Sequence, residues 1–185
     1  MIEREKKILL TQAEYETLFE LLLPQGCLIT QRNHYYDTPT FLATAHKITY
    51  RIREKDGKYQ ATVKEHCVKG VIECSLETNI GYAKNEYDIS VFEKPSLVYQ
   101  GVLETQRLRV NFGAGVEVAL DKNLYLGHCD YELEIEYAED CEKAALECIG
   151  DMEDVLKRHT CAHLPKRINL GASKSERFFF RKRRY

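Results

Sequence analysis

Apolar and polar residues alternate along several segments of this chain, and the alternation predicts β-strands. The clearest case is residues 130–137, in which three glutamates alternate with leucine, isoleucine and tyrosine. Because successive side chains of a strand point to opposite faces, such a segment carries its charges on one face and its apolar side chains on the other. The same reasoning predicts strands at residues 1–10, 26–37, 46–55, 58–67, 71–78, 103–112 and 116–121.

Helical spacing and turn residues predict the segments between these strands. Residues 11–14, Thr-Gln-Ala-Glu, have the pattern of a capping box, and apolar residues then recur at helical spacing up to Pro24. The apolar stripe of residues 139–159 predicts a second helix. Asp56-Gly57 is a strong signal for a hairpin turn. Residues 79–103 lose the alternation, and we expect two short helices there, as an insertion between the halves of the sheet.

The composition is that of an ordinary globular domain. The 185 residues, 44% of them hydrophobic and 30% charged, suit a single domain over 1–185. The formal net charge is only −2, so bulk charge favours neither a nucleic acid nor a membrane surface as partner. Seven cysteines lack a paired Cys-x-x-Cys spacing, charges begin at Glu3, and no apolar run is long enough to span a membrane. We therefore expect a soluble, cytoplasmic protein with free thiols.

The two signs of charge gather on different predicted strands. Acidic side chains concentrate in the first strand and in residues 130–137, with Glu73 and Glu77 as a third source. Basic side chains concentrate in the strands around Arg51, Lys64 and Arg107. For any one strand a solvated face is the alternative, but a surface that serves only solubility would mix the signs.

A closed sheet with these faces inward would have a strongly charged interior. Unpaired buried charges are costly, so such an interior must hold water, ions or a ligand. Lysines and arginines suit a polyanion, and a cluster of glutamates suits Mg²⁺ or Mn²⁺. In the first strand Glu3, Glu5 and Lys7 share one side, where adjacent acids repel each other unless a cation lies beside them. A metal-bound polyphosphate would satisfy both sets of charges.

The segment Glu3-Arg4-Glu5-Lys6-Lys7 resembles the Glu-x-Glu-x-Lys signature of the CYTH superfamily, also called triphosphate tunnel metalloenzymes. Its members include class IV adenylyl cyclases, thiamine triphosphatases, inorganic triphosphatases and RNA triphosphatases. The resemblance covers essentially the whole chain, in order, through residues 35–38, 51–53, 62–64, 73–77, 107–109, 132–136 and 173–175.

This resemblance implies an α+β fold, namely a closed antiparallel eight-stranded β-barrel whose tunnel holds a triphosphate, with helices packed outside. The implied ligands of Mg²⁺ or Mn²⁺ are Glu3, Glu5, Glu134 and Glu136, and Glu73 or Glu77 would help to place a second ion. The residues implied to contact phosphate oxygens are Lys7, Arg51, Arg53, Lys64, Arg107, Arg109 and Lys174. Of Tyr35 and Tyr36 one is expected in the core, and we assign a catalytic role to Tyr36, together with Lys7 and Glu73.

The implied activity is metal-dependent hydrolysis of inorganic triphosphate or of a small organic triphosphate such as thiamine triphosphate. Two alternatives stay open: a non-catalytic module that senses nucleotide or polyphosphate, and a class IV-type adenylyl cyclase. We expect a small-molecule triphosphate as the ligand, no membrane or nucleic-acid partner, and a monomer or homodimer. The basic run 181–184 is expected to be a solvated tail or a cap over the tunnel mouth. The spacing His159-x-Cys161-x-His163 does not fit a familiar zinc site.

Overall fold

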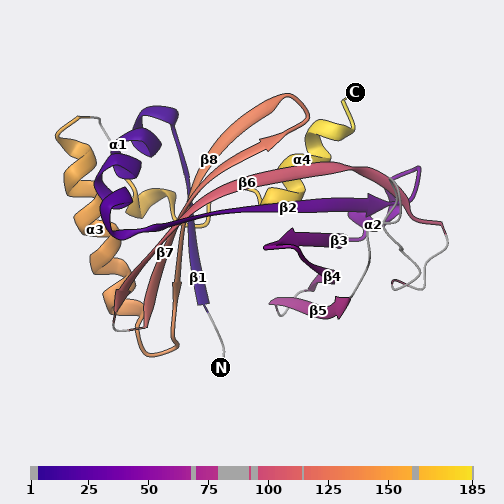
Figure 1. Cartoon of the computed structure of the whole chain (residues 1–185), viewed down its shortest axis with the longest axis horizontal. Helices are drawn as coiled ribbons and strands as arrows, with labels where there is room; N and C mark the ends of the chain where they lie inside the picture. The colour runs from indigo at the N-terminus through magenta and orange to yellow at the C-terminus, as the bar shows by residue number, and fades with distance from the viewer. Residues whose placement is uncertain are drawn as a thin grey trace. The chain divides into compact units, whose positions relative to one another are not determined.

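The fold is described from a computed structural model of the chain (Figure 1). It describes residues 4–67, 70–78, 92, 96–113, 115–159 and 163–184, without the side chains of 66, 67 and 70–78. The described residues within Met1–Ile29, Thr105–Leu124 and His128–Ala172 form one compact unit, and those within Thr30–Glu104, Tyr125–Gly127 and Ser173–Tyr185 form a second. Each unit is described by itself.

Eight strands form one antiparallel sheet, as the alternation predicts, together with helices that make the fold α+β (Figure 1). Their order is β1-β8-β7-β6-β2-β3-β4-β5, with β1 at one end and β5 at the other. Closure of this sheet into a barrel stays a prediction. The strands are β1 Arg4–Leu10, β2 Cys27–Asp37, β3 Ile48–Lys55, β4 Lys58–Cys67, β5 Gly70–Thr78, β6 Val98–Gly113, β7 Val116–Tyr125 and β8 His128–Tyr137.

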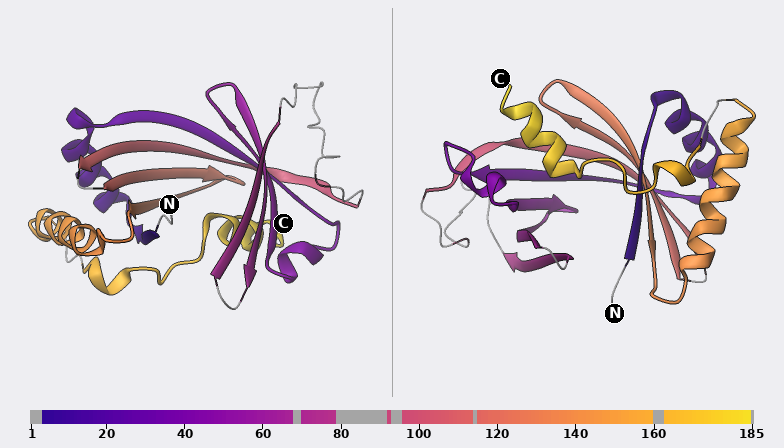
Figure 2. Two further views of the ribbon diagram at one scale, coloured as in Figure 1. Left: turned by 90° about the horizontal axis from the view of Figure 1, so that it is seen from below. Right: turned by 180° about the vertical axis from the view of Figure 1, so that it is seen from behind.

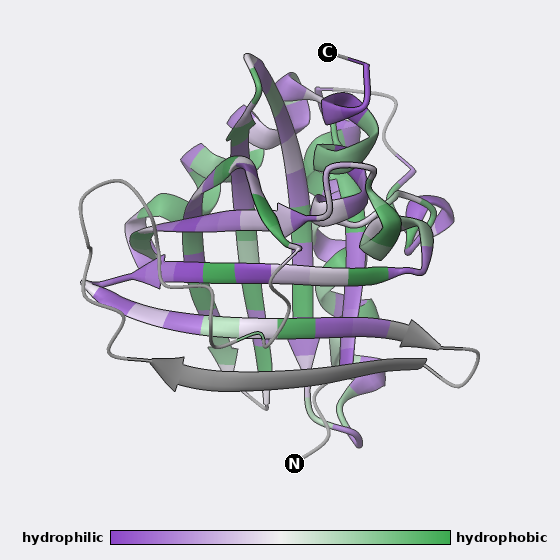
Figure 3. Cartoon of the chain, turned by 90° about the vertical axis from the view of Figure 1, so that its right-hand side faces the viewer, coloured by the Kyte–Doolittle hydropathy of each residue, from purple (hydrophilic) through white to green (hydrophobic). Residues whose placement is uncertain are grey.

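The first unit packs two helices, α1 (Gln12–Leu22) and α3 (Glu142–Lys157), on the apolar face of its strands (Figure 2). The strand residues of this core alternate with the charged ones, so one face of each strand is apolar (Figure 3). Leu18 of α1 and Ile149 of α3 are fully buried against it. The helix predicted at 139–159 is thus confirmed, two or three residues shorter at each end.

Helix α1 begins at the capping box that the sequence predicts. The Thr11 hydroxyl accepts a hydrogen bond from the Glu14 N–H at 3.3 Å, and the Thr11 N–H donates to the Glu14 carboxylate at 2.7 Å. These two bonds satisfy amide groups that the first helical turn leaves without partners. The helix ends at Leu22, and Pro24 lies in a short 3₁₀ turn, Leu23–Gln25, that follows.

In the second unit, β3 and β4 form the hairpin that Asp56-Gly57 predicts. Both turn residues have positive φ, 51° and 71°, which is the backbone form of a two-residue turn between twisted strands. Lys55 pairs with Lys58, so the loop contains only these two residues. Strand β2 pairs with the other edge of β3, and β5 pairs with β4. The short helix α2 is Leu42–Ala45.

One expectation about the second unit is wrong. Residues 98–103 are not part of a helical insertion but the start of β6. Gly101 has a φ of 139°, and a Cβ there would lie 3.1 Å from the ring of Phe178, which explains why the residue is a glycine. This glycine interrupts the alternation of side chains by which a strand is predicted from sequence. The remainder of the predicted insertion, apart from residues 92, 96 and 97, lies outside the described residues.

Near the C-terminus lies a helix, α4 (Lys174–Lys182), which includes Arg181 and Lys182 of the basic run, while Arg183 and Arg184 follow it and are exposed. Ser173 and Glu176 form a second capping box, with the same reciprocal bonds as Thr11 and Glu14. Phe178 and Phe179 are buried against Tyr35 of β2, which anchors the helix. Across the described part of the chain, no helix is long and apolar enough to cross a membrane.

Candidate functional site

Three carboxylates come together on the polar face of the first unit. Strand β1 pairs with β8 so that Glu5 lies opposite Glu136, and Lys7 lies opposite Glu134. Each of Glu5, Glu134 and Glu136 offers one carboxylate oxygen to a group whose members lie within 4.8 Å of one another. The alternation of both strands produces this cluster, because it sends these side chains to one face and the core residues to the other.

Lys7 lies beside two of these carboxylates. Its Nζ is 3.0 Å from Glu5 and 3.5 Å from Glu134. Burial raises the pKa of Glu136, Arg107 opposes this rise, and the neighbouring Glu134 adds to it. Carboxylates that repel each other and cations that compensate them therefore lie close together, as the sequence predicts for the first strand.

Arg107 of β6 joins this cluster to a further carboxylate, Asp121 of β7. The Arg107 Nε donates to Asp121 Oδ1 at 2.8 Å, and Nη2 donates to Oδ2 at 2.7 Å. Arg107 also bonds to Glu134, and its Nη1 lies 3.8 Å from Glu136. Burial alone would lower the pKa of Arg107, but these carboxylates outweigh burial and raise it. The guanidinium therefore keeps its charge.

Arg109, two residues along β6, has a different partner. Its Nε donates to Glu117 at 2.8 Å, and its Nη2 bonds to the other oxygen of the same carboxylate. This pair is more exposed than that of Arg107, and the hydrogen bond to Glu117 raises the pKa of Arg109. The two β6 arginines that were predicted to bind phosphate thus lie on the same face as the acidic cluster, and each is held by a carboxylate of β7.

The donor set of the acidic cluster suits a hard divalent cation. Mg²⁺ and Mn²⁺ take oxygen ligands and are often held by a few carboxylates together with substrate phosphates. Glu5, Glu134 and Glu136 supply such oxygens within 4.8 Å of each other. Glu3, the fourth predicted ligand, lies outside the described residues. The three described glutamates fit the predicted ion by their chemistry and spacing.

Basic side chains gather on one face of the second unit. In the strand register, Arg53 lies opposite Asn33, and Arg51 lies opposite Tyr35 on one side and Thr62 on the other. The Arg53 Nε donates to Asn33 Oδ1 at 3.2 Å. Lys64, two residues beyond Thr62 in β4, shares this face because side chains two apart in a strand point the same way.

Tyr35 lies at the centre of these cations. Its side chain is only 1% exposed and packs on Phe178 and Phe179. Burial raises the pKa of the Tyr35 hydroxyl, and surrounding cations oppose this rise. Four cations act on it electrostatically, namely Arg51, Lys174, Arg53 and Arg177. Lys174 of α4 and the two arginines of β3 thus act on the same hydroxyl.

Tyr36, predicted to be catalytic, lies on the opposite face of β2. It is 4% exposed and belongs to a core with Tyr50, Ile52 and Phe92. Its ring is tilted against those of Phe92 and Tyr99, at centroid distances of 6.1 and 5.6 Å. The alternation of β2 explains the difference, because neighbouring residues of a strand face opposite ways. Both tyrosines are buried, Tyr36 in the core with Tyr50 and Tyr35 in the core with Phe178, and the cations act on Tyr35.

Glu73, also predicted to be catalytic, is described only by its backbone. It pairs with Lys64 in the register between β4 and β5, and Glu77 pairs with Gln60. The positions of their side chains lie outside the described atoms. A second-ion role for either residue stays a prediction.

Three charged residues belong to these clusters although the sequence analysis assigned them no role. Asp121 and Glu117 alternate with buried residues of β7, and this alternation was the signal for their shared face with Arg107. Their charge partners on β6 could not be assigned from sequence, because this requires the register between two strands. Arg177 follows Lys174 by three residues, the spacing that places two side chains on one face of a helix.

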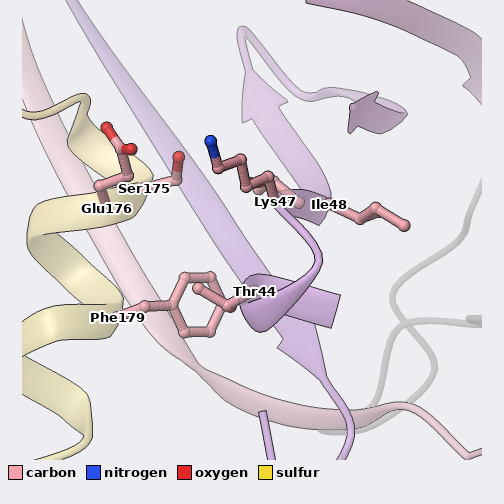
Figure 4. Close-up of a pocket in the computed structure, with 7 residues that line it drawn as sticks. Thr44, Lys47, Ile48, Ser175, Glu176 and Phe179 are labelled. Carbon is pink, nitrogen blue, oxygen red and sulfur yellow. The ribbon is translucent and has the colours of Figure 1, made fainter. Parts of the chain in front are cut away.

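A pocket of the second unit lies between the segment after α2 and the start of α4 (Figure 4). Lys47 extends toward Ser175 and Glu176 of α4, while Phe179 lies on the α4 side (Figure 4). None of the predicted site residues lines this pocket, so we do not place the reaction there. Its lining is Thr44, Lys47, Ile48, Thr49, Ser175, Glu176 and Phe179.

Known proteins resemble this chain in sequence and in fold. The sequence model of the CYTH domain matches residues 1–154. YjbK of Bacillus subtilis (strain 168), which carries a provisional assignment as a triphosphatase, is 31% identical over 150 residues, or 75% of this chain and 78% of YjbK. A crystal structure from Bacillus halodurans, provisionally assigned as an adenylate cyclase, has a TM-score of 0.66 and 26% identity over 96% of this chain and 97% of its own.

A plant structure shares the fold at lower sequence identity. HpAC1 from Hippeastrum, provisionally assigned as an adenylyl cyclase and reported to have a dominant triphosphatase activity, has a TM-score of 0.70. It is 22% identical and the similarity covers 97% of this chain and 96% of HpAC1. The family match and the similarity to YjbK agree with the signature of the first strand, and the two solved structures share the fold. The chain belongs to the CYTH domain family.

Proposed function

We propose that this protein hydrolyses a triphosphate in a metal-dependent reaction, with inorganic triphosphate or a small organic triphosphate such as thiamine triphosphate as substrate. The observation that carries the proposal is the convergence of Glu5, Glu134 and Glu136 within 4.8 Å, with Lys7 and Arg107 beside them. A module that only binds polyanions needs cations but no cluster of acids. The triphosphatase assignment of YjbK supports the same reaction class.

In this proposal Glu5, Glu134 and Glu136 hold Mg²⁺ or Mn²⁺, together with Glu3. The ion, when bound, neutralises phosphate charge and lowers the pKa of a coordinated water. Lys7 lies 3.0 Å from Glu5 and 3.5 Å from Glu134, so its ammonium is positioned to bind a phosphate oxygen that approaches these carboxylates. Phosphoryl transfer needs little more from a protein than such positioning and charge stabilisation.

The remaining cations bind the phosphate chain in this proposal. We propose that Arg107 and Arg109, and likewise Arg51, Arg53, Lys64 and Lys174, bind phosphate oxygens. The support for this step is the family membership and the common polar face of each strand. Glu73, which lies opposite Lys64 in the strand register, is proposed to take part in catalysis by helping to place a second ion that activates water. We place the enzyme in the cytoplasm, as a monomer or homodimer.

Tyr35 replaces Tyr36 in the proposed site. It lies beside Arg51, Arg53, Lys174 and Arg177, whereas Tyr36 belongs to the aromatic core. A hydroxyl surrounded by cations donates a hydrogen bond to a bound anion without adding negative charge. We therefore propose Tyr35 as a phosphate ligand.

Adenylate cyclase activity is the second candidate function. The observation that favours it is the 26% identity to the Bacillus halodurans structure, which is provisionally assigned to that activity. Cyclisation and hydrolysis both begin with a metal-bound triphosphate, so the same acidic cluster would serve either reaction. The non-catalytic sensor is the third possibility, with tight binding and no turnover.

One assay distinguishes these functions. Phosphate release and cyclic nucleotide formation are measured from inorganic triphosphate, thiamine triphosphate, ATP and GTP, each with Mg²⁺, Mn²⁺ or a chelator. We expect metal-dependent phosphate release that the chelator abolishes. Formation of cyclic nucleotide from ATP would establish the cyclase instead. Micromolar binding of triphosphate without turnover of any substrate would establish the sensor and overturn the hydrolase.

A further inference from the structure

Asp121 is a buried carboxylate bound to an arginine that also contacts the acidic cluster. Its side chain is fully buried, and both of its oxygens accept hydrogen bonds from Arg107, at 2.8 and 2.7 Å. The same guanidinium bonds to Glu134 and lies 3.8 Å from Glu136. Arg107 therefore lies between one carboxylate outside the cluster and two carboxylates within it.

This position makes Arg107 a potential competitor for a metal ion. A buried guanidinium needs a nearby negative charge, since a buried charge without compensation is strongly destabilising. If Glu134 and Glu136 were its only partners, a divalent cation could bind them only by displacing Arg107. Asp121 lessens this conflict, because a bidentate carboxylate compensates part of the guanidinium charge from outside the cluster.

We propose that Asp121 is a positioning residue for the metal site, and that it acts by holding Arg107 away from full pairing with Glu134 and Glu136. The inference rests on the proposed metal dependence. Residues that hold or orient the neighbours of metal ligands commonly change metal affinity by about 10- to 100-fold when they are substituted. Asp121 would have this effect through the charge of Arg107, without touching the ion.

The test is Mn²⁺ binding to the full chain without substrate, measured by electron paramagnetic resonance. Asp121→Asn keeps the size of the side chain and removes its charge, so Arg107 must pair with Glu134 and Glu136. We expect the Kd for Mn²⁺ to rise by about tenfold. The double variant Asp121→Asn with Arg107→Gln removes the competing cation as well, and we expect its Kd to return to that of the wild type or below.

Glu14→Gln is the matched control, because Glu14 is also a buried carboxylate bound by an arginine, Arg167, but lies outside the acidic cluster. Its Kd for Mn²⁺ should not change. Thermal unfolding shows whether each variant folds. If Asp121→Asn does not fold, the Kd of the double variant still tests the inference, because it should equal that of the wild type or lie below it.

Three results would overturn the inference. An unchanged Kd in Asp121→Asn would show that Arg107 does not compete for the ligands. A Kd raised equally in the single and double variants would make Asp121 itself a metal ligand. No binding of Mn²⁺ by the wild type would remove the proposed metal dependence as well, and so this outcome is distinct from the other two.

Discussion

Arg167 binds Glu14 through both of its terminal nitrogens, at 2.7 and 3.2 Å. The second nitrogen also bonds to the backbone carbonyl of Leu9. One side chain from the 3₁₀ segment Pro165–Arg167 thereby holds the start of α1 and the end of β1 together. Burial alone would raise the pKa of Glu14, but hydrogen bonds from Arg167 and the Thr11 N–H outweigh it, and the pKa is lowered.

This pair predicts a pH-dependent contribution to stability. Glu14→Gln should lower the free energy of unfolding at pH 7 by about 1 to 3 kcal/mol, the usual value for a hydrogen bond to a charged group. The carboxylate has a lower pKa in the folded protein, so its contribution is complete above the unfolded-state pKa of about 4.3 and is lost as pH falls through the folded-state value. Urea unfolding of both proteins between pH 7 and pH 3 measures this difference, which should shrink at low pH. A difference that stays constant with pH would contradict the linkage.

Lys7 and Lys6 are neighbours in β1 with opposite surroundings. Lys7 lies among the acidic cluster, whereas Lys6 donates to Glu142 of α3 at 2.7 Å. Lys7→Ala should lower kcat by about 10²- to 10⁴-fold, because a cation that stabilises the transition state is lost. Lys6→Ala is the control and should retain kcat, with a small loss of thermal stability. Equal kcat values for the two variants would remove Lys7 from the reaction.

Glu136 and Glu139 test the acidic cluster in the same way. Glu136→Gln removes one of three converging carboxylates, and we expect turnover to fall by more than about 100-fold and Mn²⁺ affinity to weaken. Glu139 is exposed and pairs with Arg4, outside the acidic cluster, so Glu139→Gln should change neither. Steady-state kinetics over a range of Mn²⁺ concentrations measure both effects. Full turnover by Glu136→Gln at low Mn²⁺ would exclude Glu136 as a ligand.

Tyr35 and Tyr36 offer a third matched pair. Tyr35→Phe removes the hydroxyl that lies beside four cations, and we expect kcat/KM to fall by about 10- to 100-fold, which corresponds to one hydrogen bond to a charged group. Tyr36→Phe changes a hydroxyl on the face of the aromatic core and should leave kcat/KM within about twofold. The reverse result would restore the catalytic role of Tyr36.

The strands were predictable where side chains alternate without interruption. Glu132 to Tyr137 of β8 is such a segment, and both its face assignment and its pairing with β1 place Glu134 and Glu136 in the cluster. The start of β6 was not predictable, because the positive φ of Gly101 interrupts the alternation. Helix α4 could have been predicted, since Ser173-Lys174-Ser175-Glu176 repeats the capping-box pattern of Thr11 to Glu14.

The residues of the site were easier to predict than their partners. Glu5, Lys7, Glu134 and Glu136 are fixed on one face by strand periodicity and by resemblance to a known signature. The bonds from Arg107 to Asp121 and from Arg109 to Glu117 depend on the register between β6 and β7, which no local pattern specifies. The choice between Tyr35 and Tyr36 likewise depends on which face of β2 carries the cations.

Gly101 divides β6 into two segments with opposite side-chain phases. Before it, Tyr99 stacks with His34 and Tyr36 on one face of β2, and after it, Leu103 packs with Tyr35 and Phe178 on the other. Tyr99 and Leu103 are four residues apart and would share a face in a regular strand. A regular strand without the positive φ of Gly101 would therefore turn either Tyr99 or the residues from Leu103 onward, Arg107 and Arg109 among them, to the opposite side of the sheet.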